Sequence, residues 1–75
     1  MSFELKTTDD LVRIAAAGGG FVLDASLKST DDLVRIAAAA SNKGARVTFS
    51  GLKLKSTDDL VRIGAAGKGC VVLEG

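Results

Sequence analysis

The chain has 75 residues, with ten basic and nine acidic side chains, one cysteine and no histidine. That length fits one small domain, and a net charge of +1 gives no strong attraction for nucleic acid or for an anionic membrane. Without histidine, a Cys–His or Ser–His catalytic pair and a histidine-based metal site are both excluded.

One heptapeptide, Thr-Asp-Asp-Leu-Val-Arg-Ile, occurs three times. Its copies begin at Thr8, Thr30 and Thr57. A unit repeated at roughly 20–50 residues is typical of stacked repeat proteins. The residue before each copy is Thr or Ser, with Asp three residues further on, which is a variant of the capping box and predicts that a helix starts there. The chain therefore predicts three similar helices.

The segments around these helices alternate apolar and polar residues and predict strands. They cover residues 3–6, 21–28, 47–55 and 71–75. Glycines at 18–20, 44 and 67–69 predict the helix ends. Gly51 interrupts the alternation, which predicts a bulge or a tight bend. A second interpretation splits each long strand at Ala25 or Gly51, giving β-turn-β-α units.

The predicted order β-α-β-α-β-α-β belongs to the α/β class. Helical crossovers imply a parallel sheet, and right-handed connections place all three helices on one face. We therefore predict a two-layer βα-repeat domain over residues 1–75. Its repeats are 3–19, 20–44 and 45–69, with a closing strand at 70–75. The polar side of the strands predicts that the second face of the sheet is hydrated.

In its period and its one-sided helices the chain resembles leucine-rich-repeat-like βα solenoids. Leu52-Lys53-Leu54 supplies a fragment of their signature, and Ser56 stands where they carry a ladder of Asn. The heptapeptide repeat is also similar to that of a class of uncharacterised bacterial βα-repeat proteins. These resemblances imply a solenoid-like fold and transfer no activity.

Charged residues recur at fixed motif positions. Asp9 and Arg13 lie four residues apart, as do the equivalent residues of the other two copies, and predict ion pairs within each helix worth about 0.2–0.5 kcal/mol. The aspartates could attract a divalent cation, but helices about 8–10 Å apart share one ion poorly, so capping is preferred. Lys6, Lys28 and Lys55 form a basic ladder, which we interpret as a solvated surface.

The two ends of the pattern are incomplete in complementary ways. Residues 3–6 align with 52–55 but lack the preceding half of that strand, whereas residues 71–75 align with 47–51 and lack the following half. Repeat arrays usually end in polar caps, and neither end of this pattern shows one. We therefore expect homo-oligomers formed through strand edges. A monomer with frayed ends is the alternative.

These features predict a non-enzymatic repeat module for protein interaction or self-assembly, with no cofactor and no catalytic residue. A protein partner is expected on the polar face at Asp24, Lys28, Thr48, Ser50, Lys53 and Lys55. The alternative is a small ligand- or metal-binding protein with a site formed between subunits. A single cysteine and a start unlike a signal peptide predict a cytoplasmic protein. Because the sequence has no apolar run of about 18 residues, we expect no membrane span.

Overall fold

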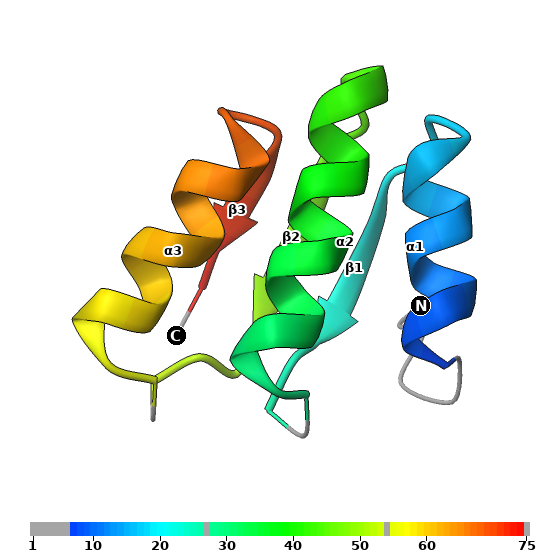
Figure 1. Cartoon of the computed structure of the whole chain (residues 1–75). Helices are drawn as coiled ribbons and strands as arrows, with labels where there is room; N and C mark the ends of the chain where they lie inside the picture. The colour runs from blue at the N-terminus through cyan, green and yellow to red at the C-terminus, as the bar shows by residue number, and fades with distance from the viewer. Residues whose placement is uncertain (1–6, 27, 54, 75) are drawn as a thin grey trace.

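Three helices and three strands alternate along the chain in the computed structural model (Figure 1), which describes residues 7–26, 28–53 and 55–74. The elements are α1 (Thr8–Ala16), β1 (Phe21–Asp24), α2 (Thr30–Lys43), β2 (Val47–Ser50), α3 (Thr57–Gly67) and β3 (Val71–Leu73). The strands form a parallel sheet in the order β1-β2-β3. The predicted α/β domain with three helices and a parallel sheet is therefore confirmed.

The strands pair in a register that follows the repeat. Leu23 of β1 lies opposite Phe49 of β2, and Phe49 lies opposite Leu73 of β3. Figure 1 shows the three helices side by side in front of the strands, in the same order as the strands. Each step along the chain therefore adds one helix and one strand beside the previous pair.

The helices begin where the capping residues predict. The side-chain oxygens of Thr7, Ser29 and Ser56 each accept a hydrogen bond from the backbone N–H three residues later, at 3.1, 3.2 and 3.2 Å. The helix ends differ more. Gly44 closes α2 with a φ of +68°, as predicted, whereas the cap of α3 is Lys68 and that of α1 is Ala17.

The predicted strands are too long. The pattern predicts strands over residues 21–28 and 47–55, but β1 ends at Asp24 and β2 at Ser50. Gly51 has a φ of +72°, which ends the extended conformation of β2. The chain then turns, with the Lys28 N–H donating to the Ala25 carbonyl oxygen at 3.1 Å and, one repeat later, Lys55 to Leu52 at 2.9 Å.

The turns lie where the second interpretation divides the strands, but no second strand follows them among the described residues. The last predicted strand also ends early, at Leu73. The strand predicted over residues 3–6 lies outside the described residues, as do Leu27, Leu54 and Gly75.

The core lies between the helices and the sheet. The largest fully buried side chains come from every helix and from two of the strands. They are Phe49, Leu11, Leu23, Leu33, Ile36, Ile63 and Val47. Among the described residues no polar or charged residue is buried. The core is therefore an apolar packing layer, and polar groups lie around it.

Candidate functional site

Two ion pairs join the helices of successive repeats. Arg35 Nη2 lies 2.9 Å from Asp9 Oδ1, and Arg62 Nη2 lies 3.0 Å from Asp31 Oδ1. Both pairs use the motif arginine of one repeat and the first motif aspartate of the repeat before it. All four side chains are more than half exposed, so each pair contributes about 0–1 kcal/mol. The pairs therefore mark the register of neighbouring helices without providing much stability.

These contacts correct the prediction of ion pairs within each helix. Arg35 pairs with Asp9 of α1 and not with Asp31, four residues before it. Arg62 likewise pairs with Asp31 of α2 and not with Asp58. Side chains four residues apart on one helix can meet, but here the adjacent helix offers a carboxylate within hydrogen-bonding distance.

The lysines at the turns also contact the preceding repeat. Lys55 Nζ donates to the backbone carbonyl oxygen of Lys28 at 3.0 Å. One repeat earlier, Lys28 Nζ lies 3.5 Å from Thr8 Oγ1. Each ammonium group therefore reaches back along the stack. This arrangement differs from the solvated ladder that the sequence predicts.

The motif valine shows the effect of a following repeat. Val12 of α1 and Val34 of α2 each precede another repeat, and both are partly buried against the core. The equivalent Val61 of α3 has no following helix among the described residues and is 62% exposed. The same side chain in the same motif is therefore uncovered only at the last helix.

The motif isoleucine shows the same effect at the opposite end. Ile36 and Ile63 each follow another helix and are fully buried. Ile14, on the first helix, is only partly buried. The motif isoleucine is therefore least buried on the first helix, and the motif valine is least buried on the last.

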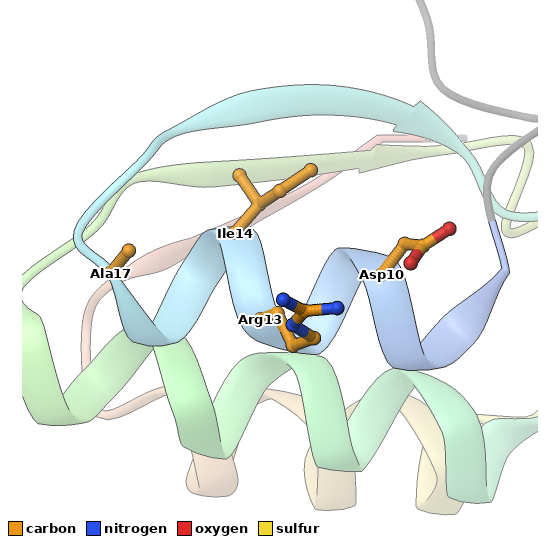
Figure 2. A pocket seen from close by; sticks show the side chains of 4 residues that line it. All are labelled: Asp10, Arg13, Ile14 and Ala17. Carbon is orange, nitrogen blue, oxygen red and sulfur yellow. The ribbon is translucent and has the colours of Figure 1, made fainter.

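An open hollow of about 430 Å³ lies beside α1 at the first end. It is lined by Asp10, Arg13, Ile14 and Ala17, which all come from one flank of that helix (Figure 2). The equivalent flank of α2 faces α1 and carries Arg35 and Ile36. The hollow therefore lies on the side of α1 where the other helices meet a preceding repeat.

A second hollow, of about 160 Å³, lies at the other end of the stack. It is lined by Leu52, Lys53, Lys55, Leu60, Leu73 and Glu74. Leu60 is only partly buried, although the equivalent Leu11 and Leu33 are fully buried. Leu73 is 36% exposed. This end therefore combines exposed leucine surface with charges of both signs.

The six residues predicted to bind a partner come from two strands and from the connections that follow them. Asp24 lies on β1, with Thr48 and Ser50 on β2, and Asp24 is paired in register with Ser50. The Ser50 hydroxyl donates to the Leu23 carbonyl oxygen at 3.4 Å. The other three residues, Lys28, Lys53 and Lys55, lie in the strand-to-helix connections. The lysines therefore follow the strands along the chain and are not part of them.

Asp24 is held in its ionised form. Its carboxylate accepts a hydrogen bond from the backbone N–H of Ser26 at 3.1 Å. This bond, with a further one from the Ser26 hydroxyl, lowers the pKa of Asp24 below its usual 3.8. A carboxyl group with a lowered pKa is a poor general acid near neutral pH, so Asp24 acts as a turn-forming acceptor.

The described part of the chain contains no group of three or more His, Cys, Asp or Glu side chains arranged to hold a metal ion. Cys70, at the start of β3, is half-buried and free of any disulfide. Within the described residues, no helix combines the length and hydropathy that a membrane crossing needs.

No protein-family model, curated protein or solved structure matches this chain. The functional surface therefore has to be identified from the contacts of the chain itself. The sequence reasoning missed the two end flanks at Arg13, Ile14, Asp58 and Val61. Their signal was present in the recurrence of the motif, because its arginine and its first aspartate pair across repeats except in the first and the last copy, respectively.

Proposed function

We propose that this chain is a non-enzymatic, solenoid-like βα-repeat module that associates with further copies of itself through the two ends of its stack. In this proposal the helices and the sheet form two layers, and each added copy extends both. The proposal rests mainly on one observation: motif side chains are less buried at the ends than beside a neighbouring repeat, since Val61 is 62% exposed where Val12 and Val34 are partly buried, and Ile14 is partly buried where Ile36 and Ile63 are fully buried.

The physical argument is the cost of leaving apolar surface in water. Burying apolar surface is worth about 25 cal/mol per Å². At the two ends, apolar surface that could be buried remains in contact with water. It belongs to Val61, Leu73, Leu60 and Ile14. Exposed sheet edges add backbone groups that can pair with another strand. Association with a second copy would bury this apolar surface and pair the backbone groups of the edge strands. The contacts would be of the kind that neighbouring repeats make within one chain.

A second candidate function is partner binding on the sheet face that carries Asp24. Val22 is 50% exposed there and lies in register with Thr48, which lies in register with Val72. This row of β-branched side chains, flanked by Asp24 and Ser50, supports a small mixed patch for another protein. The three lysines of the surface expected from the sequence lie outside this row. This second candidate surface is therefore smaller than the expected one.

Sedimentation equilibrium at several protein concentrations tests the self-association. We expect an average mass above the 7.6 kDa of one chain, rising with concentration. A mass that stays at 7.6 kDa up to millimolar concentration would contradict self-association and leave the sheet face as the better candidate.

A further inference from the structure

Of the motif arginines and the first motif aspartates, Arg13 and Asp58 are the two without an ion-pair partner among the described residues. Arg35 and Arg62 each pair with the first motif aspartate of the preceding helix. Arg13 is exposed on the first helix, and Asp58 is exposed on the last. Within residues 7–26, 28–53 and 55–74, neither forms an ion pair. One end of the stack thus displays a cation and the other an anion, at the positions that pair inside the stack.

We propose that two copies of the chain stack head to tail, with α1 of one copy packed against α3 of the other and with Arg13 paired with Asp58 across the contact. This inference rests on the proposed self-association and specifies its surfaces and its polarity. The contact would repeat the pairing of Arg35 with Asp9 and of Arg62 with Asp31. The partner is therefore a second copy of this chain.

The apolar surfaces agree with the same arrangement. Inside the stack, the motif valine of one repeat is partly covered and the motif isoleucine of the next is fully buried. In the head-to-tail contact, Val61 would meet the flank of α1 that carries Ile14. That flank lines the open hollow of about 430 Å³ (Figure 2). Apolar surface and charge therefore favour the same pair of surfaces.

A symmetric dimer fits the charges less well. Two copies joined through α3 would bring Asp58 but no Arg13 to the contact, and two joined through α1 would bring Arg13 but no Asp58. Like charges in contact oppose association. The head-to-tail contact pairs opposite charges and sets β1 of one copy beside β3 of the other, since these are the outer strands among the described residues.

Head-to-tail association is not limited to two copies. Neighbouring helices lie about 8–10 Å apart and neighbouring strands about 4.8 Å apart. A growing stack therefore curves with its helices on the outer side. Such a stack forms a ring if the curvature closes and a filament if it does not. Both assemblies contain the same contact between Arg13 and Asp58.

Charge reversal tests this contact. We would compare the full chain with the single variants Arg13→Asp and Asp58→Arg, the double variant carrying both changes, and an equimolar mixture of the two single variants. Sedimentation at low ionic strength gives the association constant, and circular dichroism checks that each variant is folded. Arg46→Asp, which reverses an exposed arginine away from both end flanks, serves as the matched control.

Each single reversal places like charges across the contact, so we expect association to weaken by about fivefold to tenfold. The double variant restores an opposite pair with its polarity exchanged, and the mixture restores opposite pairs between the two variants. Both should therefore associate nearly as well as the unmodified chain. Arg46→Asp should leave association unchanged, and added salt should reduce the differences.

Two results would overturn the inference, and they differ in what they imply. If the unmodified chain associates but the single reversals have no effect, or the double variant and the mixture show no recovery, the head-to-tail contact is wrong and self-association stands. If the unmodified chain remains at 7.6 kDa, both the contact and the proposed function fail.

Discussion

Replacing Phe49 with alanine is expected to lower the free energy of unfolding by about 3–5 kcal/mol, as measured by urea denaturation. Phe49 is fully buried in β2, the central strand, where it lies opposite Leu23 and Leu73. Truncation removes the apolar contacts of the ring and leaves a cavity that the neighbouring strands can fill only in part. Because small domains have total stabilities of about 5–15 kcal/mol, Phe49→Ala should approach unfolding.

Leu73→Ala is the matched control, because Leu73 occupies the same register position in β3 but is 36% exposed. Leu73→Ala should lower the free energy of unfolding clearly less than Phe49→Ala does, when both are measured at a concentration where the chain is monomeric. Equal losses for the two variants, or a loss below about 1 kcal/mol for Phe49→Ala, would contradict the placement of the core around β2.

Ile36→Ala is expected to cost about 2–5 kcal/mol in the free energy of unfolding. Ile36 lies in α2, between the other two helices, and is fully buried. Ile14 occupies the same motif position in α1 but is only partly buried. Ile14→Ala should therefore cost much less in a dilute, monomeric sample. Ile14 and Ile36 thus allow the effect of burial to be compared within the same heptapeptide.

The same two variants separate stability from association. Ile14→Ala should weaken self-association, since Ile14 lies on the flank that would receive α3 of another copy. Its unfolding midpoint should change little on dilution relative to that of the unmodified chain. If Ile14→Ala destabilises the dilute chain as strongly as Ile36→Ala, then Ile14 already has a full set of contacts within one copy, and the first end is not an open surface.

The helices were predictable because their signals are local. Thr7, Ser29 and Ser56 cap the helices from the positions that the motif indicates, and each bond lies within four residues of sequence. The parallel order of the strands followed from the helical connections between them. Both inferences depend on short segments and on chain connectivity, which a single sequence displays directly.

The strand ends were not predictable from alternation alone. The apolar pattern continues through Ala25 and Leu52, both of which are buried although neither belongs to a strand. Burial of alternate residues is thus common to a strand and to the turn that follows it. Gly51 was the useful local signal, because its positive φ requires a break that the hydrophobic pattern does not reveal.

The candidate site depends on contacts between repeats, which spacing within one helix cannot reveal. Arg35 has two aspartates at suitable motif positions, Asp31 on its own helix and Asp9 on the preceding one, and only the packed structure selects Asp9. The same holds for Lys55, which reaches the Lys28 carbonyl oxygen across the turns. Once the pairing between repeats is known, the repeat indicates which charges are left without it: the motif arginine of the first copy and the first motif aspartate of the last copy.

The most direct test of end-to-end association is a dilution series followed by two-dimensional amide NMR. We expect concentration-dependent shifts on both end surfaces, at Arg13, Ile14 and Ala17 in α1 and at Asp58 and Val61 in α3. Signals from the central strand β2, including Thr48 and Ser50, should remain constant. Shifts confined to one end would indicate a symmetric dimer, and shifts confined to β2 or no shifts at all would contradict the head-to-tail stack.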